Sequence, residues 1–249
     1  MLQRLARRIA GQVFGGSCFL CRGGTDATRG ETLLCAACDA DLPRLGGPLC
    51  PRCALASPDG MLCGRCLAES PAYDLTHAAL AYLFPADVLV QSLKFRGELA
   101  LAPLLGELLG ALARERHAAQ DVAVDAVLPV PLAANRLAER GYNQAMEIAR
   151  PVARALGAPL DARLCERVRD TRSQTGLPWD ARAGNVRGAF RCAASLEGAT
   201  LAVIDDVMTT GATLAELART LKHAGAARVV NCVVARAYPP GADAPLQAG

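Results

Sequence analysis

Eight of the eleven cysteines are grouped in four Cys-x-x-Cys pairs near the start of the chain. The pairs are Cys18/Cys21, Cys35/Cys38, Cys50/Cys53 and Cys63/Cys66, while Cys165, Cys192 and Cys232 stand alone. A Cys-x-x-Cys pair turns two thiolates toward one point, and two such pairs complete the tetrahedral shell that Zn²⁺ prefers. The four pairs therefore predict two zinc ions. Because sulfur fills every ligand position, these ions would be structural rather than catalytic.

Two other chemistries use the same residues. A disulfide framework needs an oxidising compartment, and the start of the chain does not resemble a secretory signal, because Arg4, Arg7 and Arg8 precede only a short apolar run. Redox catalysis uses one such pair on a βα turn, not four in a loop-rich segment. Zinc is favoured over both. The simplest arrangement places residues 18, 21, 35 and 38 on one ion and 50, 53, 63 and 66 on the other, although the spacing also permits an interleaved one.

A second stretch with chemical potential runs from Leu201 to Thr213, with the sequence LAVIDDVMTTGAT. It predicts a buried strand, two carboxylates at its carboxyl end (Asp205 and Asp206), a turn rich in Thr and Gly, and the start of a helix. Ligands of open α/β sheets bind beyond the carboxyl ends of the strands. This edge is therefore the predicted site.

Each part of that stretch suits one part of a phosphorylated sugar. Backbone N–H groups of a turn that opens a helix form an anion site, and Gly211 lets the main chain approach closely. The hydroxyls of Thr209, Thr210 and Thr213 can donate to phosphate oxygens, and the two acids can accept hydrogen bonds from vicinal ribose hydroxyls. The pattern describes a ribose 5-phosphate site. An ordinary strand, turn and helix with a capping Thr and solvated acids is the alternative.

The surrounding sequence predicts strands that alternate with helices. Apolar runs indicate strands at 76–84, 124–130, 201–204 and 229–234, and helical patterns cover 98–116, 145–156 and 214–221. Pro151 is expected to kink or split the second helix, and Gly225 to end the third. Segment 169–185 is expected to be a loop followed by a short helix. Apolar strands alternating with helices are typical of a parallel sheet covered on both faces.

A change of composition near Ser70-Pro71 predicts a domain boundary. We expect a zinc-binding domain with two four-cysteine sites over residues 1–70, an α/β domain over 71–237 and a flexible tail over 238–249. The first of these is rich in Gly and Pro and lacks long apolar periodicity, so it would depend on metal to fold.

The overall composition excludes several classes of protein. With 52% hydrophobic and 20% charged residues and a net charge of +3, the chain is a folded globular protein. No apolar stretch approaches the roughly 18 to 20 residues that span a bilayer, so we expect a cytoplasmic protein without membrane contact. Between Arg163 and Arg187 the sequence contains six arginines and three acids. That local excess suits an anionic ligand but is too weak to diagnose nucleic acid.

The stretch Leu201–Thr213 resembles the phosphoribosyl pyrophosphate (PRPP) binding signature of type I phosphoribosyltransferases. Further motifs narrow this resemblance: Lys94-Phe-Arg-Gly97, Val130-Pro-Leu-Ala-Ala-Asn-Arg136, Arg140-Gly-Tyr-Asn-Gln144, and then Thr171, Gln174, Leu177, Arg182, Asn185, Gly188 and Phe190. In this order they resemble the ComF family, whose members join an N-terminal zinc-binding segment to a phosphoribosyltransferase domain. The implied fold is a type I phosphoribosyltransferase-like parallel sheet flanked by helices and preceded by a double zinc ribbon.

The resemblance also implies a PRPP site and its residues. The catalytic pair Asp205 and Asp206 would hold the ribose hydroxyls. The 5-phosphate would be bound by the residues of the following turn: Val207, Met208, Thr209, Thr210, Gly211, Ala212 and Thr213. Arg136, Arg140 and Lys94 are candidates for the pyrophosphate side, since guanidinium forks suit phosphate oxygens. For each of the three, a surface position or ion pair is the alternative.

In the chemistry of this family, Mg²⁺ enters with PRPP, pyrophosphate departs, and a nitrogen nucleophile attacks an oxocarbenium-like C1. The loop 169–185 would exclude water as a lid. Within it, Thr171, Gln174 and Arg182 would be contacts, while Asn185 suits a structural role equally well. No segment of the sequence indicates which nucleophile would accept the ribose 5-phosphate group. A site of this kind is compatible with transfer, with hydrolysis or with sensing.

The ComF resemblance further implies a role in natural transformation, after single-stranded DNA reaches the cytoplasm. The alternative to an enzyme is therefore a zinc-ribbon adaptor that binds single-stranded DNA or competence proteins, including a helicase-type partner. Near the cysteine pairs stand Arg22, Arg44, Arg52 and Arg65. Residues 1–70 hold eight arginines and six acids, a small excess, and few aromatic residues for base stacking.

Overall fold

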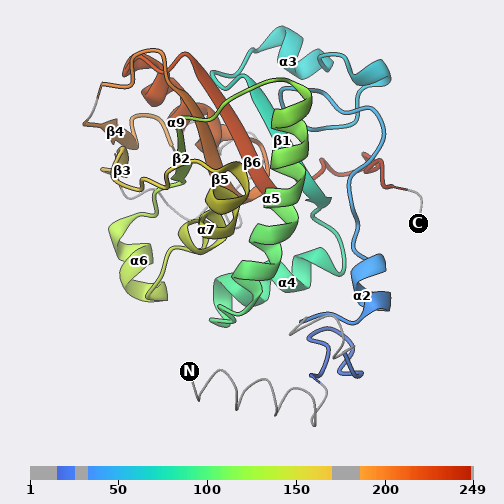
Figure 1. Cartoon of the computed structure of the whole chain (residues 1–249). Coiled ribbons are helices and arrows are strands. Elements are labelled where there is room, and N and C mark those ends of the chain that lie inside the picture. Colours follow the sequence, from blue (N-terminus) through green and yellow to red (C-terminus); the bar gives the residue numbers. More distant parts are fainter. Residues whose placement is uncertain (1–15, 26–32, 170–185, 194, 248–249) are drawn as a thin grey trace.

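A computed structural model describes residues 16–25, 33–169, 186–193 and 195–247 (Figure 1). Its centre is a four-stranded sheet in the order β1-β6-β5-β2, and every neighbouring pair is parallel. The strands are β1 (Leu75–Ala81), β2 (Ala126–Pro129), β5 (Thr200–Met208) and β6 (Arg228–Arg236). The predicted parallel α/β sheet is confirmed. The strand expected at 201–204 continues to Met208, so both aspartates lie within β5 rather than after it.

Side chains alternate between the two faces of this sheet and form two buried clusters. On one face, Ile204 and Val230 pack with α5 (Leu101–Ala119) and α7 (Gln144–Leu156). On the other face, Val203 and Val229 pack with α9 (Ala212–His223). Helices on both faces explain why the strands are apolar throughout.

The contact between α5 and α7 corrects one prediction. Helix α7 runs unbroken through Pro151, so this proline does not split it. A Cβ atom on Gly106 of α5 would overlap Pro151 Cγ and would lie 2.6 Å from the Ile148 carbonyl oxygen. The missing side chain at Gly106 therefore leaves room for the proline ring between the two helices.

The described part of the cysteine-rich segment contains three short helices: α2 (Ala36–Ala40), η2 (Pro58–Gly60) and α3 (Gly64–Ala68). Between them, the chain lies along β1: the Leu45 N–H donates to the Ala79 carbonyl and the Thr76 N–H to the Pro51 carbonyl. The end of the chain, expected to be flexible, pairs here as well, because the Gln247 N–H donates to the Arg44 carbonyl and Leu246 forms a bridge with Leu45.

Two helices that the sequence patterns did not predict frame the carboxyl edge of the sheet. They are α4 (Ala86–Phe95) and α6 (Ala134–Arg140), and both lie at the lower end of the molecule in Figure 1. A separate antiparallel pair, β3 (Cys165–Arg167) and β4 (Phe190–Cys192), follows them in the chain. It flanks residues 170–185, which lie outside the described part of the chain and include Thr171, Gln174, Arg182 and Asn185 of the expected lid.

Candidate functional site

The eight paired cysteines form two clusters of four. The first cysteine cluster is Cys18, Cys21, Cys35 and Cys38, the second is Cys50, Cys53, Cys63 and Cys66, and within each all Sγ atoms lie within 4.8 Å of one another. Sulfur atoms 3.7 Å apart (Cys21 and Cys35) and 3.5 Å apart (Cys53 and Cys63) match the roughly 3.8 Å edge of a tetrahedron with Zn–S bonds of about 2.3 Å. The structure therefore has the sequential pairing, and the donor set fits zinc.

The main chain of each cluster favours thiolates. Burial acts to raise the pKa of Cys18 and Cys50, but backbone N–H groups outweigh it and lower the pKa values to about 6 and about 7. The Cys63 N–H, for example, lies 3.4 Å from Cys50 Sγ. Thiolate is the form that binds metal, and one cysteine of each cluster is thus favoured in that form. The pKa values of Cys38, Cys53 and Cys66 are raised instead, that of Cys38 chiefly by a hydrogen bond with Cys35 and those of Cys53 and Cys66 chiefly by burial, so these ligands would release protons when a metal ion binds.

The two aspartates at the end of β5 differ in environment. Asp206 is 2% exposed, and its Oδ1 lies 2.9 Å from Lys94 Nζ at the end of α4. Its Oδ2 is buried and accepts no hydrogen bond from any described residue. Asp205 is half-buried, and burial followed by the charge of Asp206 raises its pKa to about 8. Asp206 is thus paired with the Lys94 cation, whereas Asp205 holds its proton more tightly than an ordinary carboxyl group.

Lys94 joins this site from a distant part of the chain. Burial alone would lower the pKa of Lys94, but the carboxylates of Asp206 and Asp205 outweigh burial and raise it. The lysine therefore stays charged. It brings a cation to the carboxyl edge of β5.

The turn after β5 has a backbone conformation and a close approach that require a glycine. Gly211 has a φ of +85°, and a Cβ atom there would lie 2.7 Å from Met208 Cε and 2.9 Å from Tyr73 Oη. Only glycine meets both conditions without strain. The Ala212 N–H donates to Thr210 Oγ1 at 3.2 Å, a local hydrogen bond within the turn that leads into α9. Thr209 and Thr213 are half-buried beside it.

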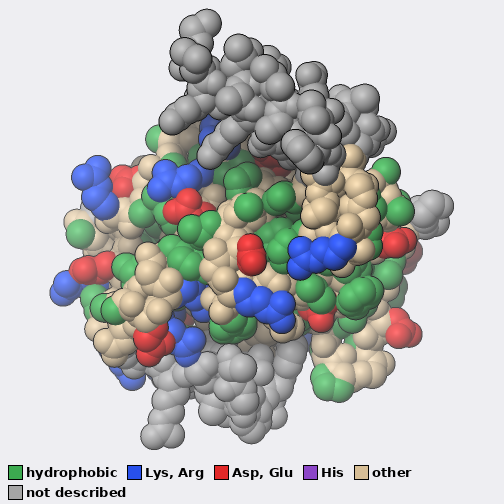
Figure 2. Space-filling model, turned by 90° about the horizontal axis from the view of Figure 1, so that it is seen from below, with side chains coloured by type: hydrophobic (Ala, Val, Ile, Leu, Met, Phe, Trp, Pro, Cys, Tyr) green, Lys and Arg blue, Asp and Glu red, His purple; other side chains and the backbone are tan. Residues whose placement is uncertain are grey.

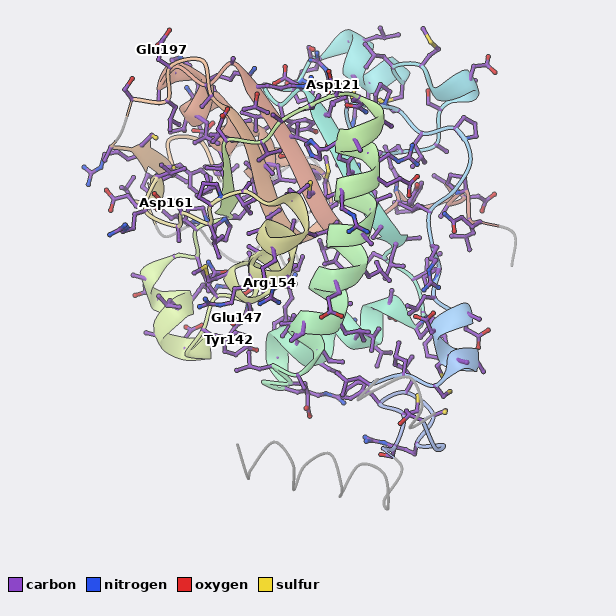
Figure 3. All side chains as sticks on the ribbon, in the orientation of Figure 1. Asp121, Tyr142, Glu147, Arg154, Asp161 and Glu197 are labelled. Atoms are coloured by element: carbon purple, nitrogen blue, oxygen red, sulfur yellow. The ribbon has the colours of Figure 1, made fainter. Side chains whose placement is uncertain are left out.

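A cavity of about 270 Å³ lies between α4 and α6. Its lining contains all three cations predicted for the pyrophosphate side, and the full set is Lys94, Phe95, Gly97, Arg136, Glu139, Arg140 and Tyr142. The Arg140 guanidinium lies 5.6 Å from the centre of the Phe95 ring and donates to Gln144 Oε1. Tyr142 donates to the Leu93 carbonyl and stands just before α7, near Glu147 (Figure 3). The cavity therefore joins the end of α4 to the turn between α6 and α7.

On the face seen in Figure 2, basic and acidic side chains stand apart among hydrophobic and neutral ones. Near the cysteines, Arg44 pairs with Asp39 and Arg52 donates to the Pro71 carbonyl. Of these two arginines near the cysteine pairs, one is thus bound to an acid of the chain and the other to a main-chain carbonyl.

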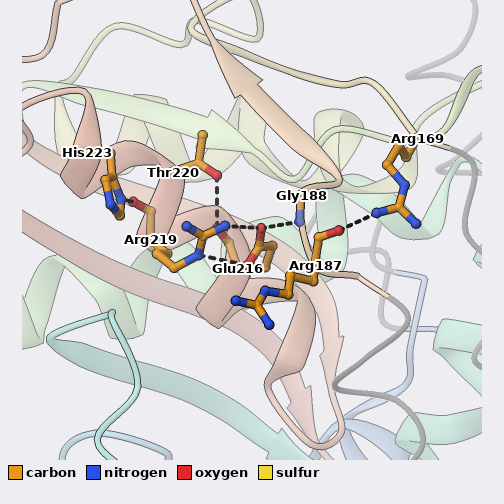
Figure 4. Close-up of polar contacts among 7 residues, drawn as sticks. All are labelled: Arg169, Arg187, Gly188, Glu216, Arg219, Thr220 and His223. Carbon is orange, nitrogen blue, oxygen red and sulfur yellow. Dashed lines mark hydrogen bonds and ion pairs between the residues drawn. The ribbon is translucent and has the colours of Figure 1, made fainter.

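A network on α9 holds the segment that follows residues 170–185 (Figure 4). The Gly188 N–H donates to Glu216 Oε1 at 2.5 Å, and Arg219 donates to both oxygens of the same carboxylate. Burial acts to raise the pKa of Glu216, but Arg219 and the Gly188 N–H outweigh it and lower the pKa. Arg169, the first residue of the expected lid, is described and donates to the Arg187 carbonyl at 2.6 Å. The described residues on both sides of 170–185 are therefore held together near α9.

One residue of the site has no counterpart among the sequence predictions. Arg236, the last residue of β6, is fully buried behind the turn and donates to the carbonyl of Met208 at 2.9 Å and to the carbonyl of Thr209. An arginine at the end of an apolar strand ordinarily indicates a solvent-exposed position. Only the tertiary structure shows that it is buried.

Comparisons with known proteins agree with this arrangement. A double zinc ribbon domain matches residues 9–67, and a phosphoribosyl transferase domain matches residues 142–244. The second range contains Asp205 to Thr213 but not Lys94 or Arg136. The chain is thus a double zinc ribbon protein with a phosphoribosyltransferase domain.

Curated relatives specify the family. The chain is 36% identical to the DNA utilization protein YhgH of Salmonella typhimurium over 86% of this chain and 94% of the relative. It is 34% identical to the YhgH of Escherichia coli K12 over the same shares, and 30% identical to the competence protein F of Haemophilus influenzae over 90% and 98%. The chain belongs to the family of these proteins, the ComF family. Among the described residues, no helix combines the length and apolarity needed to cross a membrane.

Proposed function

We propose that the carboxyl edge of β5 binds the ribose 5-phosphate part of PRPP and that the protein transfers this group to a nitrogen nucleophile. The observation that carries the proposal is the buried Asp206, whose Oδ1 pairs with Lys94 and whose Oδ2 has no partner among the described residues. A buried carboxylate oxygen without a donor is costly, and a ligand hydroxyl would satisfy it.

The residues around Asp206 divide the ligand among them. The ribose hydroxyls donate to Asp205 and Asp206, and the main-chain N–H groups and hydroxyls of Thr209 to Thr213 bind the 5-phosphate. The pyrophosphate occupies the cavity between α4 and α6, where Lys94, Arg136 and Arg140 supply positive charge. Since Lys94 touches Asp206 and also lines the cavity, it connects the two ends of the ligand.

Mg²⁺ fits the same acids, because it prefers phosphate oxygens together with one or two carboxylates. When bound with PRPP, it would neutralise the pyrophosphate and make it a better leaving group. The protein's own contribution is position and charge: the acids fix the sugar and stabilise the positive charge that develops at C1, while the cations of the cavity stabilise the departing pyrophosphate. The pKa of Asp205 is raised, so this acid would release its proton to solvent if Mg²⁺ bound beside it.

We place this activity in the handling of DNA taken up during natural transformation, in the cytoplasm. The relatives are named a DNA utilization protein and a competence protein, and they match nearly the whole chain. Single-stranded DNA and a helicase-type competence protein are the partners that this role implies. If an adaptor role dominates, single-stranded DNA binds with a steep salt dependence whether or not Asp205 is present. A shift assay without a complex at low salt would exclude it.

A screen for pyrophosphate release tests the proposed reaction. The full-length protein is mixed with PRPP and Mg²⁺ and offered ammonia, amines and nucleobases in turn. We expect release with at least one acceptor, and loss of that release in Asp205→Asn/Asp206→Asn. Release with none of them would contradict transfer to these nitrogen nucleophiles, and equal release from the double variant would remove the assigned site.

A further inference from the structure

The guanidinium of Arg236 is buried without an acidic partner. Its side chain is 0% exposed, and none of its hydrogen bonds to the described residues is to a carboxylate. Burial, the largest influence, lowers its pKa. A buried arginine without a counter-charge is rare unless main-chain carbonyls compensate it, so its acceptors show what it holds in place.

Those acceptors belong to two regions far apart in the sequence. The Nε atom donates to the carbonyl of Cys53 at 2.7 Å, and Cys53 belongs to the second cysteine cluster. The Nη1 atom donates to the carbonyls of Met208 and Thr209. Here β5 leads into residues 209–213, the proposed phosphate-binding turn, called the phosphate turn below. One planar group thus joins the main chain of a zinc ligand to the start of the proposed phosphate site.

Two tyrosines reinforce the same junction. Tyr73 is buried, and its hydroxyl oxygen would lie only 2.9 Å from a Cβ atom added to Gly211. Tyr238, two residues after Arg236, donates its hydroxyl to the carbonyl of Ala54 at 3.2 Å. The second cysteine cluster and the phosphate turn therefore share one buried contact region.

The first cysteine cluster lacks these contacts. Among its cysteines Cys18 is buried, and it packs with Leu34 and Leu42 into the group of side chains formed with α4 and α5. No hydrogen bond within the described residues joins this cluster to residues 205–213. It supplies a matched control within the same chain.

We propose that Arg236 is a positioning residue that couples the second zinc ion to the phosphate turn, so that zinc at Cys50, Cys53, Cys63 and Cys66 and a phosphate ester at Thr209–Thr213 bind cooperatively. The inference rests on the proposed function for its ligand. Zinc fixes Cys53, Cys53 fixes Arg236, and Arg236 fixes the carbonyls that open the turn. When the ion leaves, the guanidinium loses one acceptor, and the turn loses its support.

Coupling between two binding sites is reciprocal. If zinc strengthens the binding of a phosphate ester, the ester must strengthen the binding of zinc by the same factor. Typical couplings correspond to factors of about 5 to 150, and we expect about tenfold here, since one hydrogen-bonded side chain is the main link.

The first test measures zinc release from the full-length protein with a chromogenic chelator, with and without ribose 5-phosphate. In the wild type, we expect the ester to slow the release of one zinc ion, by about tenfold if the whole coupling falls on the dissociation rate, and to leave the other unchanged. Arg236→Lys keeps the positive charge but cannot donate to the Cys53 and Met208 carbonyls together, so the slowing should disappear in this variant. Arg228→Lys, at the other end of β6, is the control and should keep it. Equal slowing of both ions, or unchanged slowing in Arg236→Lys, would overturn the inference.

The second test needs no ligand and separates this inference from the proposed function. Hydrogen exchange at residues 205–213 is compared in Cys63→Ser and Cys21→Ser, which each remove one ligand from one cluster. We expect faster exchange in the first variant alone. If exchange at the turn is the same in both, the coupling is wrong, whether or not the wild type binds ribose 5-phosphate. If only the first variant exchanges faster and no ester binds, the coupling stands and the proposed ligand is wrong.

Discussion

The two cysteine clusters have the same ligands but occupy different places in the fold. The first packs through Cys18 against the α4 and α5 side of the sheet, and its Cys21 is exposed. The second packs on the α9 side, where Cys50, Cys53 and Cys66 are buried with Met208 and Leu214. The same Cys-x-x-Cys spacing thus leads to two clusters that pack with different faces of the sheet, and the second packs with the end of β5.

The largest difference should appear when one ligand is removed from each cluster. Cys63→Ser should lower the Tm by about 10 °C or more, because losing a buried structural zinc costs several kcal/mol and 1 kcal/mol is worth about 2 to 4 °C in a chain of this size. Cys21→Ser should lower it by less than half as much. Thermal unfolding with zinc analysis of both variants measures this, and equal shifts would erase the contrast.

The pair of Lys94 and Asp206 tests whether the site is held by its own charges as well as by zinc. Lys94→Met leaves Asp206 buried without its cation, and we expect a loss of about 3 kcal/mol in the free energy of unfolding. The double variant Lys94→Met/Asp206→Asn should recover most of it, since no buried charge is left. Urea unfolding of the wild type, both single variants and the double variant measures the coupling. Additive losses in the double variant would mean that the ion pair is not formed. As a control, zinc analysis should find both ions in every variant.

Gly106→Ala disturbs the α5 side of the sheet, the face opposite the second cysteine cluster. The added methyl group meets Pro151 and the Ile148 carbonyl, so α5 and α7 must separate, at a cost of about 2 kcal/mol. Because Gly106, Ile148 and Pro151 are not among the residues that line the cavity, we expect the affinity for PRPP to change little from that of the wild type. A calorimetric titration checks this, and a large loss of affinity would show that the α5 side also supports the site.

The smallest effect is expected from Gly211→Ala. A positive φ and two nearby side-chain ends together cost about 1 to 2 kcal/mol, since Met208 Cε and Tyr73 Oη can move in part. We also expect the second zinc ion to leave faster than in the wild type, while the first is unaffected. Chelator kinetics measure both ions in one experiment. Faster loss of the first ion would argue against a link confined to the second cluster.

Much of this arrangement could be predicted from the sequence, because it depends on local patterns. The Cys-x-x-Cys spacing identified both clusters, and apolar runs identified the four parallel strands. Helix α4 was missed, although Leu89, Val90 and Leu93 carry the spacing of a buried helical face. Without this helix, the prediction could not bring Lys94 to Asp206.

Other features depend on contacts between distant residues. The burial of Arg236 requires β6 to end beside both Cys53 and Met208, which no local pattern shows. The room for the Pro151 ring of α7 likewise depends on a glycine in another helix, Gly106 of α5. Sequence patterns therefore predicted the ligands and the turn, whereas the link between them came from the tertiary structure.

The central claim is that Asp205 and Asp206, at the carboxyl edge of β5, hold the sugar of PRPP. The most direct test is calorimetric titration of PRPP into the wild type, with and without Mg²⁺, and into Asp205→Asn/Asp206→Asn. Asp121→Asn is the control, because Asp121 lies at the far end of α5 from Tyr142 (Figure 3). We predict binding that requires Mg²⁺, that survives in the control and that is lost in the double variant while the fold persists. Undiminished binding in the double variant would contradict the account.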